Sequence, residues 1–369
     1  MSISPKAETM KPILALPYKS VKTNINMRSF SLIAALLVLT ASFLPEKAQA
    51  QDPQFSQFYA APLYLNPAFA GSARCPRIGI NYRNQWPALN KTYITSSVSY
   101  DQHVDNLSGG LGLIIMNDKA GDGTINTTSI SGMYSYQLNI SRDFSIRMGM
   151  QATLMQKKLD WDKLYFGDQI DPRYGFVYNT QENRPSDLSK SYPDFSAGIL
   201  AYSSKVYGGV AVNHLTQPDE AFIVEGSSAL PMKITAHFGA MLPVGDTRVY
   251  RYAATRAEGT YVSPNVLYQQ QGSANQLNLG VYVLKSPMIG GLWMRSNFGG
   301  AGTASWSGES FIALVGVQKG LFKFGYSYDV TISKLTNNAT AGSHEISLGI
   351  QFECRPKKKR FRTISCPSF

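Results

Sequence analysis

Repeated alternation of side-chain type is the sequence feature that most restricts how this chain can fold. Apolar residues alternate with polar or small ones between residues 144 and 154, and the same period recurs at 276–283, 322–329 and 346–352. A period of two places one kind of side chain on each face of a β-strand. Segments of about ten such residues are typical of a transmembrane barrel, whose strands face lipid on one side and the lumen on the other.

Fourteen such segments predict an all-β fold, a closed transmembrane antiparallel β-barrel. They are expected near 77–86, 92–102, 108–118, 124–138, 144–158, 192–202, 206–215, 232–244, 259–269, 273–284, 288–298, 307–318, 322–333 and 344–353. Aromatic residues make up 12% of the chain and charged residues only 16%, which suits lipid-facing strands with aromatic girdles. The even strand number predicts that both chain ends are periplasmic.

The connections between these segments supply an independent test, because outer-membrane barrels have short periplasmic turns and longer outer loops. With the first strand running outward, the short turns are 103–107, 139–143, 203–205, 285–287 and 319–321, and long outer connections include 159–191, 216–231, 299–306 and 334–343. The exception is 245–258, which is too long for its inner position. It hides either a miscounted strand pair or a periplasmic excursion.

The first 50 residues have the three parts of a signal peptide. Arg28 precedes an apolar run over 30–44, which is followed by Ala48-Gln49-Ala50, a small-residue cleavage pattern. Because Met27 precedes Arg28, residues 1–26 are either a mis-assigned start or a long basic region. The expected division is a signal peptide over 1–50, a periplasmic lead-in over 51–76, a barrel over 77–353 and a basic periplasmic tail over 354–369, in the outer membrane of a Gram-negative bacterium.

The basic charge of the chain is concentrated at its two ends. The formal net charge is +11, but the leader holds six basic and two acidic residues, and residues 353–369 carry five of the seven charges that remain. A nucleic-acid partner is therefore not expected. The tail either contacts lipid headgroups, docks a periplasmic partner or is a solvated terminus; its basic residues are Lys357, Lys358, Lys359, Arg360 and Arg362.

Three cysteines remain in the mature chain, where an oxidising compartment permits disulfides. Cys75 precedes the first predicted strand, Cys354 follows the last, and Cys366 lies in the tail. Barrel closure makes the first and last strands neighbours. We therefore predict a disulfide between Cys75 and Cys354, or between Cys366 and either of them.

Catalysis and metal binding find no support in the sequence. The four histidines have no metal-type spacing to one another or to cysteine. His344 lies between Ser343 and Glu345, but neighbouring side chains in a strand point to opposite faces, so a catalytic triad is badly served there. We expect no enzyme activity, no cofactor and no metal.

The longest outer connection, 159–191, mixes aromatic and charged side chains. A loop of this length is usually functional or disordered, and so many aromatic residues favour a folded cap, a partner-binding surface or a lid packed over the lumen. The candidate binding residues are Trp161, Tyr165, Phe166, Asp168, Asp171 and Arg173.

Several motifs resemble those of the PorP/SprF family of Bacteroidetes outer-membrane proteins. They are Gln54-Phe55-Ser56-Gln57-Phe58-Tyr59, Leu65-Asn66-Pro67-Ala68-Phe69-Ala70-Gly71, Tyr82-Arg83-Asn84-Gln85-Trp86, Phe166-Gly167-Asp168-Gln169, Tyr192-Pro193-Asp194-Phe195, His214-Leu215-Thr216-Gln217-Pro218 and Gly342-Ser343-His344-Glu345. The resemblance implies a non-enzymatic accessory of type IX secretion and gliding motility. Such a protein helps a particular cargo, often an adhesin with a matching C-terminal domain, to reach or stay on the surface. The resemblance also implies links to periplasmic-ring or peptidoglycan-anchored components.

The alternative function is a porin or a hydrophobic-solute transporter. Fourteen strands enclose more space than side chains fill, so a sealed barrel needs a plug. We expect the lead-in, the long outer loop or both to occlude the lumen; the candidate plug residues are Phe55, Phe58, Tyr59, Asn66 and Phe69.

Overall fold

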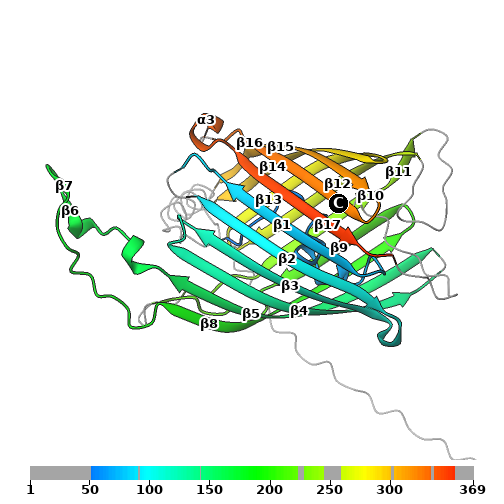
Figure 1. Cartoon of the computed structure of the whole chain (residues 1–369), viewed down its shortest axis with the longest axis horizontal. Coiled ribbons are helices and arrows are strands. Elements are labelled where there is room, and N and C mark those ends of the chain that lie inside the picture. The colour runs from blue at the N-terminus through cyan, green and yellow to red at the C-terminus, as the bar shows by residue number, and fades with distance from the viewer. Residues whose placement is uncertain are drawn as a thin grey trace, which may run out of the picture. The chain divides into compact units, whose positions relative to one another are not determined.

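A computed structural model describes residues 51–89, 92–141, 143–222, 228–244, 259–300, 303–333 and 336–353. In these ranges, fourteen antiparallel wall strands follow one another around a closed barrel (Figure 1). They are β1 (Arg77–Gln85), β2 (Tyr93–Val104), β3 (Gly109–Ala120), β4 (Ile125–Asn139), β5 (Phe144–Leu159), β8 (Ser189–Ser203), β9 (Val206–Asn213), β10 (Lys233–Ala240) with its continuation β11 (Leu242–Val244), β12 (Thr260–Gln271), β13 (Ala274–Lys285), β14 (Met288–Gly300), β15 (Thr303–Lys319), β16 (Phe322–Thr331) and β17 (Ser343–Gln351). The predicted fold class is confirmed.

The barrel closes by direct strand pairing at its seam, between the first and last wall strands, and also on either side of the unassigned connection 245–258. β1 pairs with β17 along its whole length, with Arg77 opposite Gln351. β10 pairs with β9 on one side and with β12 on the other, so no further strand stands between β10 and β12. The connection 245–258, which the sequence left open, lies outside the described residues.

The two rims of the barrel differ in their connections. The inner rim is the end at which β1 begins and β17 ends. Five of the six other pairs of strand ends at this rim are joined by the short segments 105–108, 140–143, 204–205, 286–287 and 320–321, and the exception is the connection between β11 and β12. We assign it to the periplasm, because short turns face that side. The outer rim carries the long connection between β5 and β8.

One long outer connection was predicted wrongly. The segment 299–306 was expected to be a loop, but β14 continues to Gly300 and β15 starts at Thr303. The pairing of Gly300 with Thr303 extends this hairpin beyond two register shifts. Loop length therefore separates the two rims less cleanly than the sequence indicated.

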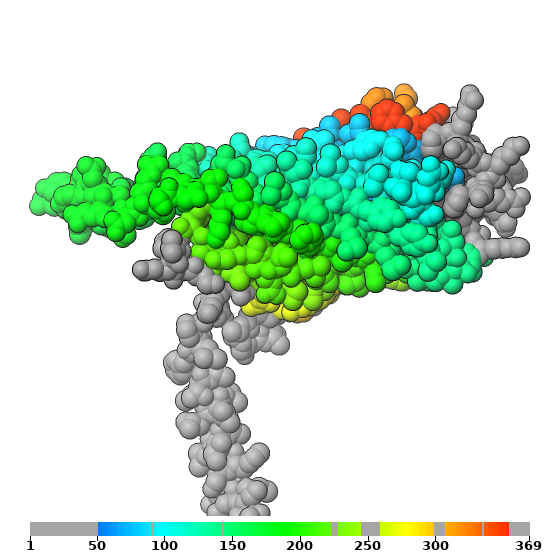
Figure 2. Space-filling model, turned by 90° about the horizontal axis from the view of Figure 1, so that it is seen from below, coloured from blue at the N-terminus to red at the C-terminus, as the bar shows by residue number. Residues whose placement is uncertain are grey.

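The two faces of the wall have opposite chemistry, as the alternation predicts. Met150 and Leu292 face outward and are each 71% exposed, whereas Arg147 faces inward and is 1% exposed. Apolar side chains of this kind alternate outward along β5 and β13. The part of the chain that contains β5 forms the teal-to-green surface of the barrel in Figure 2. This arrangement matches lipid outside and a polar interior. None of the helices in the described ranges is long and apolar enough to cross a bilayer.

The predicted signal peptide over 1–50 and the predicted basic tail over 354–369 lie outside the described residues. The residues just before β1 are described, however, and they fold inside the barrel. They include the short helix α2 (Pro62–Leu65) and the 3₁₀ turn η1 (Pro67–Phe69). All side chains of α2 and η1 except that of Tyr64 are buried.

Candidate functional site

The lead-in forms what we call the luminal segment, Asp52–Ser72, which fills the centre of the barrel. Its aromatic side chains belong to the buried core: Phe55, Phe58, Tyr59 and Phe69 are at most 6% exposed. Phe58 packs edge-on against Trp293 of β14 with ring centroids 5.0 Å apart. The interior thus contains an apolar core that alternation alone did not predict, because inward wall positions are mostly polar.

Glycines in the wall make room for the turn at the middle of this segment. A Cβ at Gly149 would lie 2.4 Å from the backbone nitrogen of Ala68, and one at Gly198 would lie 2.1 Å from Oδ1 of Asn66. Asn66 uses that same oxygen to accept the N–H of Ala68 (2.9 Å), and its Nδ2 donates to the carbonyl of Ile199 in β8 (3.2 Å). Asn66, a predicted plug residue, therefore caps η1 and ties it to the wall.

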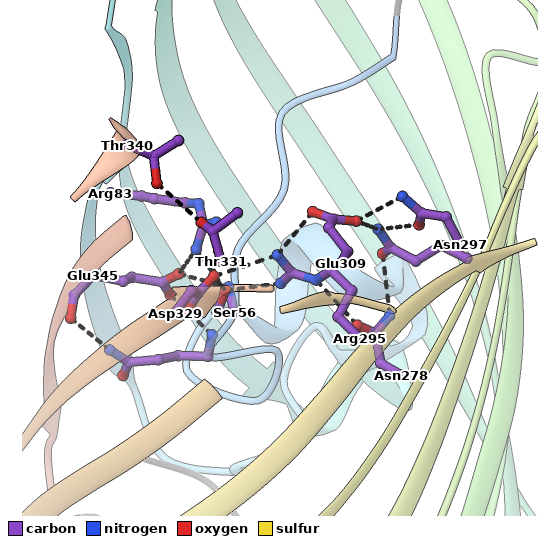
Figure 3. A network of polar contacts seen from close by, with 12 residues as sticks. Ser56, Arg83, Asn278, Arg295, Asn297, Glu309, Asp329, Thr331, Thr340 and Glu345 are labelled. Carbon is purple, nitrogen blue, oxygen red and sulfur yellow. Dashed lines mark hydrogen bonds and ion pairs between the residues drawn. The ribbon is translucent and has the colours of Figure 1, made fainter. Parts of the chain in front are cut away.

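A buried network of charges holds the segment nearer the outer rim (Figure 3). Nη2 of Arg83 lies 2.9 Å from Oδ2 of Asp329, and Nη1 of Arg295 lies 3.3 Å from the same oxygen. Ser56 donates its backbone N–H to Oε2 of Glu345 (2.6 Å) and its hydroxyl to Asp329 (2.6 Å). The two buried guanidinium groups thus face two buried carboxylates, and Ser56 bonds to both of these acids. Arg295 also lies 3.8 Å from the partly exposed carboxylate of Glu309.

A second polar cluster, the Asp52 anchor, holds the beginning of the segment. Oδ2 of Asp52 lies 2.9 Å from Nε2 of His214 and 3.4 Å from Nζ of Lys233, while Gln271 donates to Oδ1 (3.1 Å). The other ring nitrogen of His214 lies 2.8 Å from Oδ2 of Asp194. The imidazole is therefore placed between two carboxylates.

The electrostatic interactions in the Asp52 anchor favour the ionised forms of Asp52 and His214. Burial alone would raise the pKa of Asp52, but the charges of Lys233 and His214 outweigh burial and hold that pKa below its ordinary value. Burial would lower the pKa of His214, yet the charge of Asp52 and the hydrogen bond to Asp194 raise it to about 9. His214 is therefore an imidazolium at neutral pH.

The outer loop, residues 160–188, contrasts with the luminal segment. Tyr165, Tyr174, Phe176 and Tyr178 are 58–69% exposed. Figure 1 shows its two short strands, β6 (Ile170–Asp171) and β7 (Gly175–Phe176), apart from the strands of the wall. The prediction that this loop helps to occlude the lumen is wrong for its tip, because these aromatic side chains face solvent.

Contacts within the loop nevertheless give it a defined fold. Asp171 accepts the backbone N–H groups of Arg173 (2.7 Å) and Tyr174 (2.9 Å), which close the β6–β7 turn and hold the pKa of Asp171 below its ordinary value. Asp168 accepts the hydroxyl of Thr180 (3.0 Å). The rings of Trp161 and Phe166, both partly buried, lie 4.9 Å apart at the loop base.

Sequence reasoning found the aromatic residues of the luminal segment but missed their polar partners. Arg295, Asp329, Glu345 and His214 were not singled out as site residues. A signal existed, because a charged residue that becomes buried at an inward position needs a partner. Which of them meet across the lumen could not be deduced from spacing.

The remaining predicted residues are only partly described. Cys75 is disulfide-bonded, and its partner lies outside the described ranges, as do Cys354, Cys366 and the basic tail. The choice of partner therefore stays a prediction. Glu345 is fully buried in the lumen, whereas His344 lies on the outer face with its Nδ1 2.8 Å from the hydroxyl oxygen of Tyr326, so no triad forms there. Within the described ranges, no three His, Cys, Asp or Glu residues are grouped to hold a metal ion.

Comparison with known protein families identifies the chain. A sequence model of the family described as type IX secretion system membrane protein PorP/SprF matches residues 47–350. The chain belongs to this family. The matched range of this PorP/SprF member includes the luminal segment, the outer loop and all but the last residue of the barrel wall.

Solved structures similar to this PorP/SprF protein are outer-membrane barrels of low sequence identity. The toluene transporter TbuX of Ralstonia pickettii is 9% identical with a TM-score of 0.45, covering 80% of this chain and 94% of that one. BamA of Haemophilus ducreyi lacking POTRA domains 1–3 is 10% identical with a TM-score of 0.38, covering 75% and 70%. The translocator domain of the autotransporter NalP of Neisseria meningitidis is 8% identical with a TM-score of 0.31, covering 88% and 97%. No curated protein matches the chain.

Proposed function

We propose that this PorP/SprF protein is a non-enzymatic accessory of the type IX secretion machinery that helps one secreted adhesin to reach or stay on the cell surface. The observation that carries the proposal is the contrast between a filled lumen and an exposed, folded outer loop. A diffusion channel needs an open lumen, and it does not require an outer loop that exposes a folded aromatic surface. Aromatic and arginine side chains of the kind that the loop exposes commonly anchor protein interfaces.

The outer loop is the proposed cargo site. Tyr174 and Phe176 project from a hairpin whose shape is set by Asp171, and the guanidinium of Arg173 lies 5.6 Å from the centre of the Tyr174 ring. Such a surface loses little conformational freedom on binding, because the hairpin is already formed. The basic tail is the proposed contact with periplasmic components or lipid headgroups.

The alternative is a porin or a hydrophobic-solute transporter. The luminal segment weighs against it, because a diffusion pathway would have to pass the buried rings of Phe58, Tyr59 and Phe69. We propose that the segment seals the barrel. A large and steady conductance of the purified protein in planar bilayers would contradict that seal.

Deletion of the gene followed by surface proteomics separates the two functions. Loss of one adhesin from the surface with unchanged solute uptake supports the accessory role, and the reverse pattern supports the transporter. A more specific version of this experiment replaces the deletion with a double variant, Tyr174→Ser with Phe176→Ser. This variant should release the cargo while the barrel stays folded. Ile332→Ser is the matched control, since Ile332 is 44% exposed at the outer rim but belongs to a different connection.

A further inference from the structure

The luminal segment crosses the whole barrel in the direction opposite to β1. It ends at the inner rim, where Gly71 donates its N–H to Oδ2 of Asp101 (2.8 Å) and Asp101 pairs with Arg77 (2.8 Å), the first residue of β1. The middle of the segment lies against Gly149 of β5. Ser56, which comes earlier in the segment, lies in the buried charge network nearer the outer rim. The beginning of the segment must therefore lie toward the outer rim.

The Asp52 anchor fixes where the segment begins. Gln271 is the last residue of β12, Lys233 is the first residue of β10, and His214 directly follows β9. All three positions are at the outer rim, and all three side chains bond to Asp52. Gln51, the preceding residue, is exposed. The sequence predicted a periplasmic lead-in, whereas Asp52 lies at the rim opposite to the one at which β1 begins.

The same anchor is joined to the outer loop through the strap, which we define as residues 214–221. Thr216 donates to Asp194 (2.9 Å), which also bonds to His214. Further along, Glu220 accepts a hydrogen bond from Nζ of Lys157 (2.6 Å), and the backbone carbonyl of Ala221 accepts one from Nζ of Lys190 (3.1 Å). Lys157 lies at the end of β5 and Lys190 at the start of β8, so the strap contacts both legs of the outer loop.

We infer that the mature protein presents its amino terminus at the cell-exterior mouth of the barrel, beside the legs of the outer loop, although both ends of the barrel wall lie at the periplasmic rim. The mature terminus and the loop legs then form one external surface that is open to an extracellular polypeptide. The location of the terminus follows from the anchor, from the rim assignment and from the predicted cleavage after residue 50. It does not depend on which cargo the protein serves.

Cysteine labelling of cells that express the full-length protein tests this location. A cysteine is inserted between Gln51 and Asp52, and a membrane-impermeant maleimide is added to intact and to permeabilised cells. Tyr174→Cys in the loop tip is the external control. Lys205→Cys is the periplasmic control, because Lys205 is exposed in the short inner turn between β8 and β9. The parent protein reports any labelling of the native cysteines.

The inference expects the inserted cysteine to label in intact cells to the same extent as Tyr174→Cys, while Lys205→Cys labels only after permeabilisation. If the inserted cysteine behaves like Lys205→Cys, or resists labelling in both states, the inference is overturned. If the two controls exchange their behaviour, the barrel is oriented the other way, and the external role of the loop fails with it. Cargo retention is measured separately, so loss of the cargo role alone leaves the labelling result intact.

Discussion

The luminal segment and the outer loop are both rich in aromatic residues, but the structure uses them in opposite ways. In the luminal segment, rings such as Phe69 are fully buried and stack on wall side chains, with 5.4 Å between the centres of Phe69 and His237. In the outer loop, rings such as Tyr174 are mostly exposed. Aromatic content by itself therefore does not distinguish a plug from a recognition surface; the partners available to each ring do.

The two regions also differ in how their charges are held. The ion pair between Arg83 and Asp329 is buried on both sides, whereas the pair between Arg184 and Asp162 in the loop is 56% and 80% exposed. Burial removes water from the first pair, so losing one partner leaves the other charge uncompensated. Exposed pairs are screened and contribute little. The segment should therefore be sensitive to single substitutions that the loop tolerates.

The largest expected effect comes from removing one member of the buried network. Asp329→Ala should lower the free energy of unfolding by about 3–5 kcal/mol, because two guanidinium groups lose their shared carboxylate. Asp162→Ala, the matched change in the loop, should lower it by less than about 1 kcal/mol. Urea unfolding of both purified variants, followed by tryptophan fluorescence, measures the difference. If both variants lower the free energy of unfolding equally, the two regions do not differ in how strongly their ion pairs contribute to stability.

Next in size is the pH dependence of the Asp52 anchor. The pKa of His214 is raised from its ordinary value to about 9, so its contribution is fully present below the ordinary pKa of about 6.5 and is lost as pH rises through 9. The loss should reach roughly 3 kcal/mol, seen as increased conductance or protease sensitivity of the segment between pH 7 and 10. His214→Gln should flatten that profile, and His344→Gln, on the outer wall face, should leave it unchanged.

A smaller effect is expected from filling a glycine site beneath the segment. Gly149→Val places a side chain against the backbone of Ala68 and should destabilise the protein by about 1–3 kcal/mol through overpacking, with a rise in single-channel conductance as the segment shifts. Gly132→Val is the control, because a Cβ there meets no atom within 4 Å. Conductance that stays at the parent level in Gly149→Val would argue against a seal at this point.

The smallest stability effect is expected in the loop. Tyr174→Ala should change the free energy of unfolding by no more than about 0.5 kcal/mol, since the side chain is 69% exposed. The same variant should reduce retention of the cargo adhesin at the surface, measured by proteomics of shed and cell-bound fractions. Destabilisation comparable to that of Gly149→Val would show that Tyr174 is structural.

Most of the wall could be predicted because strand alternation is a local property. The stripe that includes Met148 and Met150 faces outward as expected, and the ends of β1 differ from the prediction by a single residue. The hairpin of β14 and β15 was mispredicted, because the sequence predicted an outer connection over 299–306. Pairing across the hairpin nevertheless extends both strands to within two residues of each other.

The candidate site was predictable only in part. The sequence alone determined that a sealed barrel of this size needs a plug, and it offered the aromatic lead-in that includes Phe55 and Phe69 as one candidate. It could not show that the segment enters with Asp52 at the outer rim. It also could not show that Arg83, Asp329 and Ser56, distant in the chain, meet at one point.

That part was decided by tertiary structure, for a physical reason. Alternation specifies which face of a strand a residue occupies, but barrel closure and register decide which inward residues oppose one another across the lumen. Once that interior is formed, buried charges must find partners. The outer loop lies outside this constraint, which is why its aromatic side chains stay exposed.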